Sequence, residues 1–204
     1  MIEISKVTIV IVDCVDYNRS KFSLDHSCSK VKFKEALLLS HFDEHDPYSV
    51  KIDRINSIRD YSKFLIKNLT DYFDTEFVIN AQHDGFVWNP EMWSDEFYEY
   101  DYIGAPWPEQ VLIDGMPKHF NVGNGGFSLR SKRLQDFLKN DENIILSYAE
   151  DVAICQLNRM YLISKGFKFA PYEVAKRFSY EHLPWKHDEQ IVKAFGCHGF
   201  KLIK

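Results

Sequence analysis

The residues best suited to chemistry lie in the stretch Gln82-His83-Asp84-Gly85-Phe86, which directly follows an apolar run at 77–81. A buried strand of that kind ends at the rim of an open α/β sheet, where such sheets bind ligands. A carboxylate there, followed by a glycine that lets backbone approach closely, suits a divalent cation carrying a diphosphate. An isolated Asp-Gly pair is more often an ordinary turn. Three segments further along the chain favour a cation-binding site over an ordinary turn.

The first of these segments is rich in glycine: Asn121-Val122-Gly123-Asn124-Gly125-Gly126-Phe127-Ser128-Leu129-Arg130-Ser131. Glycines permit positive φ and remove side-chain bulk, so a ligand can lie against the backbone. The spacing differs from the dinucleotide-binding fingerprint, and the segment leads into a strand rather than a helix. A loop or bulge in a sheet explains the same glycines equally well.

The other two segments carry ionisable side chains. Glu150-Asp151 stands at the start of a predicted helix, where the helix dipole favours negative charge, so an acidic cap is the commoner explanation. The alternative is a general base that takes a proton from an acceptor hydroxyl. His198 lies between small residues, and its neutral imidazole could bind a metal, although a lone His is more often a surface or capping residue.

Alternating strands and helices are predicted to position these groups. We expect strands at 7–13, 49–53, 76–81 and 126–130, and helices at 29–40, 57–72, after Ser131, and at 150–164. Ser57 with Asp60 has the pattern of a helix cap, and Gly166 that of a helix end. The segment 90–124 is expected to be irregular and to cover one side of a cleft, with Trp107 near a donor or acceptor. This alternation predicts a single α/β domain over residues 1–204.

Composition narrows the class of protein. The chain has 204 residues, 45% hydrophobic and 27% charged, with a net charge of -5, which is ordinary for a globular domain. It has no basic stripe, so nucleic acid is not expected as a partner. The four cysteines form no Cys-x-x-Cys pair and fit a reducing compartment. The short apolar run at 7–12 is neither a membrane span nor a signal peptide, so we expect a cytoplasmic protein; the oligomeric state stays open.

Together these segments resemble a family of small glycosyltransferase-like domains of bacteria and large DNA viruses. The matching pieces run in family order from about residue 55 onward. They are Tyr61-Ser62-x-Phe64, Gln82-x-Asp84-Gly85-Phe86, Trp93, Phe97, Tyr100-Asp101-Tyr102-Ile103-Gly104-Ala105-Pro106-Trp107, Gly123-Asn124-Gly125-Gly126-Phe127-Ser128-Leu129-Arg130-Ser131, Glu150-Asp151, Phe178-Ser179-x-Glu181 and Phe195-Gly196-x-His198-Gly199. The two long motifs are the specific ones, and the first third of the chain carries no comparable motif.

The resemblance implies a GT-A-like (Rossmann-like) fold, with three layers around a mixed, mostly parallel sheet. It also implies a transferase for a hexosyl or deoxyhexosyl group. Its donor would be a nucleotide-sugar, with a UDP-sugar as the first choice. Its acceptor would be a hydroxyl group of a glycan, and its cofactor would be Mn²⁺ or Mg²⁺. Such an enzyme would work in the cytoplasm, or in the host cytoplasm if the chain is viral.

The resemblance also assigns roles to individual residues. Asp84 fits the last position of the metal-binding Asp-x-Asp motif of these enzymes, and His198 fits their late metal-binding His. Gln82 stands in the first position, which removes one negative charge and would make metal binding weaker. Asp151, preceded by Glu150, fits the acid that serves as base in inverting members.

The donor would contact several further positions. The end of the first strand and a nearby helix would hold the nucleotide base, and the glycine segment would face the donor. The residues assigned in this way are Val12, Asp13, Ser62, Lys63, Gln82, His83, Gly125 and Gly126.

Two other classes of function fit part of the pattern. A metal-dependent nucleotidyltransferase or nucleotide-sugar hydrolase would use similar carboxylates, but usually with more than one acid on the metal. A non-catalytic carbohydrate-binding domain would keep the aromatic residues and glycines without needing Asp151.

Overall fold

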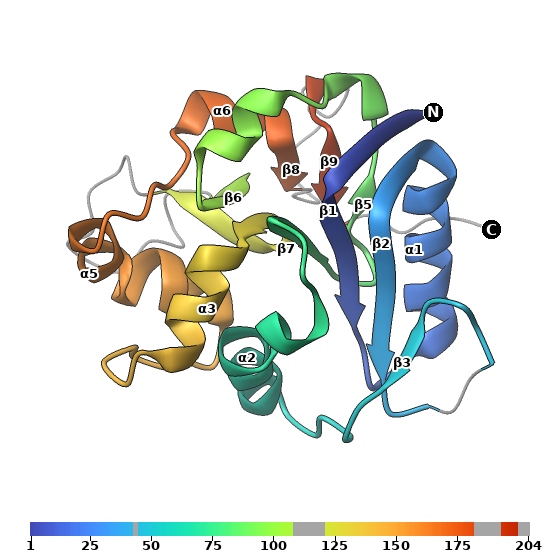
Figure 1. The fold of residues 1–204 in the computed structure, drawn as a ribbon, viewed down its shortest axis with the longest axis horizontal. Coiled ribbons are helices and arrows are strands. Elements are labelled where there is room, and N and C mark those ends of the chain that lie inside the picture. Colours follow the sequence, from blue (N-terminus) through green and yellow to red (C-terminus); the bar gives the residue numbers. More distant parts are fainter. Residues whose placement is uncertain (43–44, 108–120, 182–192, 200–204) are drawn as a thin grey trace.

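The computed structural model describes residues 1–42, 45–107, 121–181 and 193–199. Its main feature is a six-stranded sheet with strand order β3-β2-β1-β4-β7-β6 (Figure 1). Strand β7 is antiparallel to both of its neighbours, so the other five strands run in one direction. The strands of this sheet are β1 (Ile2–Val12), β2 (Val31–Ser40), β3 (Ser49–Lys51), β4 (Phe77–Ala81), β6 (Tyr102–Pro106) and β7 (Val122–Ser131).

Helices cover both faces of this sheet, which gives three layers (Figure 1). The α-helices are α1 (Tyr17–Lys30), α2 (Ile58–Lys67), α3 (Lys132–Asn140), α4 (Glu150–Val152), α5 (Arg159–Ser164) and α6 (Tyr172–Phe178). Between α4 and α5 the segment Ala153–Leu157 is π-helical. Short 3₁₀ turns occur at Leu69–Tyr72, Pro90–Met92 and Asp95–Glu99.

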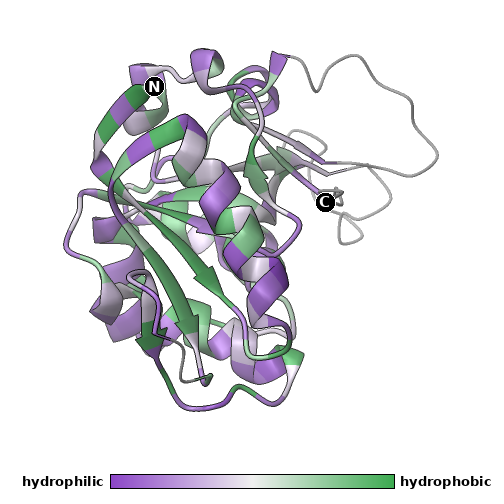
Figure 2. Cartoon of the chain, turned by 90° about the vertical axis from the view of Figure 1, so that its right-hand side faces the viewer, coloured by the Kyte–Doolittle hydropathy of each residue, from purple (hydrophilic) through white to green (hydrophobic). Residues whose placement is uncertain are grey.

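The two-residue period of β1 separates the two cores. Ile9 and Ile11 pack with α1 and α6, whereas Val10 and Val12 pack with α2 on the opposite face. Figure 2 shows the resulting hydrophobic strands inside a more polar shell of helices. Burying each such aliphatic side chain contributes about 1.5–3 kcal/mol, so both layers are needed for a stable sheet.

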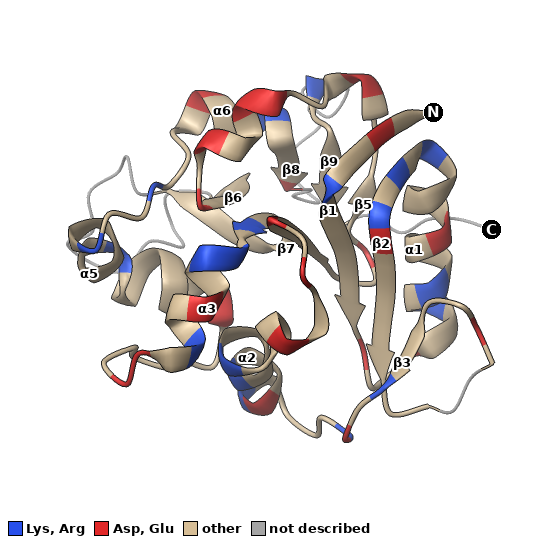
Figure 3. Ribbon diagram, in the orientation of Figure 1, with Lys and Arg blue, Asp and Glu red and all other residues tan. Residues whose placement is uncertain are grey.

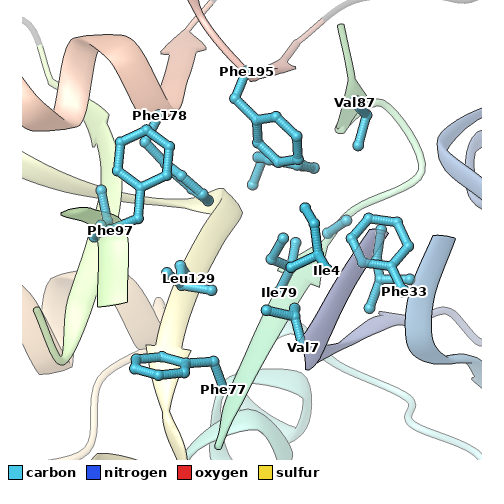
Figure 4. Packing of buried hydrophobic residues seen from close by; sticks show 14 of the residues in the cluster. Ile4, Val7, Phe33, Phe77, Ile79, Val87, Phe97, Leu129, Phe178 and Phe195 are labelled. Carbon is cyan, nitrogen blue, oxygen red and sulfur yellow. The ribbon is translucent and has the colours of Figure 1, made fainter. Parts of the chain in front are cut away.

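A smaller sheet of three strands stands beside the main one, with the order β5-β9-β8. Its strands are β5 (Phe86–Val87), β8 (Ser179–Glu181) and β9 (Gly196–His198). Aromatic rings join it to the main sheet: Phe178 and Phe195 lie 6.0 Å apart between ring centroids, and each contacts Phe127 of β7. Figure 4 shows these rings over the strands that carry Ile79 and Leu129. This packing fixes the small sheet at the rim that β4 reaches.

Most predicted boundaries agree with the structure where capping chemistry marks them. The side chain of Ser57 accepts a hydrogen bond from the backbone N–H of Asp60, and that of Ser131 accepts one from Leu134. Gly166 follows α5 with a φ of +85°, a conformation that favours glycine.

The predicted helix at 29–40 is wrong. Residues 17–30 form α1, and β2 (Val31–Ser40) begins directly after it, between β1 and β3. The inner face of α1 carries buried serines instead of a full apolar stripe, namely Ser20, Ser23 and Ser27. Without an apolar stripe, α1 lacks the usual sequence signal of a helix, whereas the apolar residues of β2 resemble such a stripe.

The segment 90–124 is also more regular than predicted. It contains two 3₁₀ turns, all of β6 and the start of β7, and residues 108–120 lie outside the described part of the chain. Trp107 does not face a cavity rim as expected: it is 6% exposed and packs in a core cluster with Tyr102, Ile154 and Cys155. Trp107 therefore contributes to the hydrophobic core that packs under β7.

Charges of both signs are interspersed over the helices and loops, while the C-terminal halves of β1 (residues 7–12) and β2 (residues 36–40) carry none (Figure 3). Among the described residues, no helix combines the length and apolar character needed to span a bilayer.

Candidate functional site

Asp84 and His198 meet at the rim of the sheet, although 113 residues separate them in sequence. Asp84 follows β4 and His198 ends β9; the Oδ1 atom of Asp84 lies 3.3 Å from Nε2 of His198. The same Nε2 lies 3.1 Å from Oε1 of Gln82. On the other side of the ring, Nδ1 lies 2.7 Å from Oε2 of Glu181. His198 is thus held between carboxylates on both of its nitrogens.

The environment of these groups favours their charged forms. Burial alone would lower the pKa of His198, but its bonds to Asp84 and Glu181 raise it to about 10. Burial acts to raise the pKa of Asp84, and the bond and charge of His198 outweigh it, so this pKa is lowered. His83, whose Nε2 is 3.7 Å from the second oxygen of Asp84, has a lowered pKa, chiefly because it is partly buried.

The glycines of β7 separate this group from the acid pair at the start of α4. A Cβ atom on Gly126 would lie 2.1 Å from the His198 ring, and one on Gly125 would lie 2.4 Å from a carboxylate oxygen of Glu150. Neither glycine has positive φ, contrary to one reason given for them from sequence. Their role is close packing: the space that a side chain would fill is occupied by His198 on one face of β7 and by Glu150 on the other.

The two acids at the start of α4 have different surroundings. Glu150 is buried and forms an ion pair of 2.9 Å with Arg130, which is itself fully buried in β7. Asp151 has no such cation; its oxygens accept hydrogen bonds from the backbone N–H groups of Gly125 and Val152. Burial first, and the charge of Glu150 second, raise the pKa of Asp151 to about 6. Glu150 therefore holds the strand and helix together, and Asp151 has the properties of a base.

A cavity of about 350 Å³ opens next to this group, between the end of β1 and the start of α2. Its lining combines apolar residues, namely Val12, Val15, Ile55 and Ile58, with polar ones, namely Asn56, Ser57, Gln82 and His83. Tyr61 lines it as well, and the pKa of this phenol is raised by burial and then by the charge of Glu150. The charge of Glu150 thus acts on a residue that lines the cavity, although neither Glu150 nor Asp151 is among the lining residues.

The structure leaves some predicted donor residues outside this cavity. Ser62 is buried, and its hydroxyl donates a hydrogen bond to the carbonyl of Ser147. Lys63 is exposed on α2 and is not among the residues that line the cavity. Asp13 does line it, but its carboxylate accepts hydrogen bonds from Val15, Asp16 and Ser20. Asp13 therefore shapes the turn at the end of β1.

Sequence reasoning missed the apolar lining of the cavity and the role of Glu181. Val15 and Ile58 are 83% and 62% exposed, which is unusual for apolar residues at the start of two helices. The signal available in the sequence was an apolar residue directly at the start of a helix, at a position that the core does not require. Glu181 stood in the short family-like piece Phe178-Ser179-x-Glu181, but sequence reasoning assigned it no role, because its partner His198 lies on another strand.

The sequence matches a family described as a protein of unknown function (DUF5672), over residues 47–198. The chain belongs to the DUF5672 family. The matched region contains every group of the site apart from the end of β1. No curated protein matches the sequence.

Solved structures are similar in fold. A glycosyltransferase involved in the glycosylation of the major capsid of PBCV-1 has 13% identity and a TM-score of 0.51, covering 95% of this chain and 92% of its own. The galactosyltransferase LgtC, in complex with donor and acceptor sugar analogs, has 13% identity and a TM-score of 0.50, covering 94% and 86%. At such identity the similarity shows the fold alone, and this DUF5672 chain has the GT-A glycosyltransferase fold.

A divalent cation fits the group around Asp84. Its Oδ1 atom is buried and lies 3.3 Å from Nε2 of His198 without the geometry of a good hydrogen bond, so this oxygen could also bind a cation. Carboxylate and amide oxygens with one imidazole nitrogen form a donor set suited to Mn²⁺ or Mg²⁺. The described residues hold no cluster of three or more His, Cys, Asp or Glu side chains arranged around one metal position. The diphosphate of a substrate would supply further oxygens, as is common for Mg²⁺.

The packing of β7 leads to a first prediction. Gly126→Ala is expected to displace the His198 ring and weaken binding of UDP with Mn²⁺, because the new methyl overlaps that ring. Gly125→Ala is expected to displace the acid pair instead, and to lower turnover more than donor binding. Calorimetry with UDP and Mn²⁺, beside turnover of the two variants, tests this division. Equal effects of both variants on both quantities would contradict it.

Proposed function

We propose that this protein is a metal-dependent glycosyltransferase that moves a sugar from a nucleotide-diphosphate-sugar to an acceptor hydroxyl, with inversion at the anomeric carbon. One observation carries the proposal. The close-packed glycines of β7 lie between the Asp84–His198 pair on one side and Asp151, a carboxylate of raised pKa, on the other. The cavity at the end of β1 is lined by Gln82 and His83, which directly precede Asp84 in the sequence. The GT-A fold and the resemblance of the long motifs to small glycosyltransferase-like domains support it.

Each group has a role in that reaction. The apolar and polar residues that line the cavity would hold a nucleotide base, and Gln82 would face the ribose or the sugar. Asp84 and His198 would bind Mn²⁺ or Mg²⁺, which when present acts as a Lewis acid toward the leaving diphosphate. Asp151 would take the proton of the acceptor hydroxyl as the bond to the anomeric carbon forms. The ion pair of Glu150 with Arg130 anchors the segment that carries Asp151; the charge of Glu150 raises the pKa of Asp151, and that of Arg130 partly offsets this effect.

The raised pKa of Asp151 predicts how the reaction depends on pH. A base must be ionised, so kcat/KM is expected to fall about tenfold per pH unit below about pH 6. Unfolding does not explain such a loss, because a raised Asp pKa means that the folded state holds the proton more tightly and gains stability as pH falls through this range. A pH profile with parallel unfolding curves measures both. A flat profile between pH 8 and pH 5 would contradict the assignment.

The reaction class is tested by product analysis. The protein is first screened with UDP-, GDP- and TDP-sugars and Mn²⁺ by thermal shift, since ligands of the native state raise its apparent stability. The donor that stabilises it is then supplied with isotope label. Nucleoside diphosphate with a labelled acceptor product identifies a transferase; nucleoside monophosphate identifies a pyrophosphatase. Binding without turnover would overturn the proposal in favour of a carbohydrate-binding domain.

A further inference from the structure

Glu181 has no role in the reaction described above, yet it makes one of the shortest contacts of the site. Its Oε2 atom lies 2.7 Å from Nδ1 of His198, a length typical of a charge-assisted hydrogen bond. Both side chains are largely buried, at 17% and 16% exposed. Strands β8 and β9 are parallel, and their register places Glu181 directly beside His198. The backbone of the small sheet therefore fixes this contact.

The two nitrogens of the His198 ring face different partners. Nδ1 faces Glu181, and Nε2 faces Asp84 and Gln82 across the ring. A cation beside Asp84 would thus be reached by Nε2 and lies on the far side of the ring from Glu181. The backbone of Gly126 packs against the same ring and limits its rotation. These contacts leave Glu181 able to orient His198 but not to share its cation.

We propose that Glu181 is a positioning residue of the metal site. Its carboxylate accepts the Nδ1 proton of His198, which selects the tautomer whose Nε2 lone pair is available to a cation bound between His198 and Asp84. Carboxylates that bind the second nitrogen of a metal-ligating His commonly have this effect, and their loss weakens metal binding about 10- to 100-fold. The inference rests on the proposed function, since it assumes a divalent cation at Asp84 and His198.

The test is Mn²⁺ binding to the whole chain in the presence of UDP, followed by the electron paramagnetic resonance signal of free Mn²⁺. Glu181→Ala is expected to weaken Mn²⁺ binding about 10- to 100-fold. Glu181→Gln is expected to recover most of the affinity, because an amide oxygen still accepts the Nδ1 proton. Glu173→Ala is the matched control: Glu173 is an exposed carboxylate on α6 whose ion-pair partner is Lys176. This control should bind Mn²⁺ as the wild type does.

A second measurement separates orientation from general loss of structure. In protein with ¹⁵N-labelled histidine and Mg²⁺ with UDP, the His198 proton is expected on Nδ1 in the wild type and in Glu181→Gln. In Glu181→Ala it should be shared between the two nitrogens. If Glu181→Ala fails to fold, the wild type alone still tests the inference, because a His198 proton on Nε2 in the protein loaded with Mg²⁺ and UDP would overturn it.

The possible failures differ from one another. A wild type that binds no Mn²⁺ with UDP would overturn the metal site of the proposed function, and the inference with it. A wild type that binds Mn²⁺, with Glu181→Ala binding equally well, would overturn the inference alone. Glu181→Gln binding as weakly as Glu181→Ala would show that the charge of Glu181 matters more than its acceptor, and would also overturn the positioning role.

Discussion

Asp151→Asn is expected to lower turnover about 10²- to 10⁴-fold, the usual contribution of a general base. Asn keeps the shape of Asp and one oxygen for the N–H of Gly125, but it cannot take a proton. The second backbone N–H, from Val152, loses its acceptor, which costs about 1 kcal/mol. The loss of turnover should therefore far exceed the loss of stability. Steady-state kinetics with the identified donor and chemical denaturation of the same samples measure the two.

Binding of UDP with Mn²⁺ to Asp151→Asn should match that of the wild type, because Asp84, His198 and the cavity are unchanged. This separates a base from a helix cap: Asn caps a helix as well as Asp does, so a capping role predicts near-normal turnover. Near-normal turnover would end the assignment of Asp151. A product that retains the anomeric configuration of the donor would end it as well, since an inverting reaction needs this base.

Asp84→Asn is expected to have the complementary effect, on donor binding. It removes the partly buried carboxylate charge beside His198, so Mn²⁺-dependent binding of UDP should weaken at least about tenfold, or about 1.4 kcal/mol. Calorimetric titration with UDP, with and without Mn²⁺, measures the metal-dependent part. Asp74→Asn is the control, because Asp74 is exposed and precedes β4, at the end of the strand opposite to Asp84.

The effect must be specific to the metal. UDP binding without Mn²⁺ should be equal in the wild type and in both Asp variants, because the cavity that would hold the base is untouched. Metal-dependent binding that survives in Asp84→Asn would show that the cation is held elsewhere.

Local signals were enough to predict much of the fold. The apolar runs of β1 and β4 and the capping residues Ser57 and Ser131 act within a few residues of chain, so sequence reveals them. The helix α1 was missed because its inner face is polar. The hydroxyl groups of Ser20 and Ser23 donate hydrogen bonds to Asp13 and to the carbonyl of His83, so partners outside the helix satisfy them.

The candidate site was predicted in part for the same reason. Asp84 and Asp151 follow recognisable elements, whereas the pairing of His198 with Glu181 depends on the register between β8 and β9. Ser62 and Lys63 were assigned to the cavity by fold position. On α2 it is Ile58 and Tyr61 that line the cavity instead. Successive residues of a helix point in different directions, so the position of the helix in the fold does not specify which of its residues face the cavity.

Strand order in the small sheet has a consequence for when the protein can become active during its synthesis. β9 lies between β5 and β8, so those two strands have no partner until residues 196–198 have been added. All six strands of the large sheet have been synthesised by residue 131. Much of its core can therefore form on the ribosome before residues 196–198 are added. A nascent chain would therefore already be folded around its large sheet while His198 is still unmade. Competence to bind a donor would appear abruptly, at the moment the third strand of the small sheet arrives.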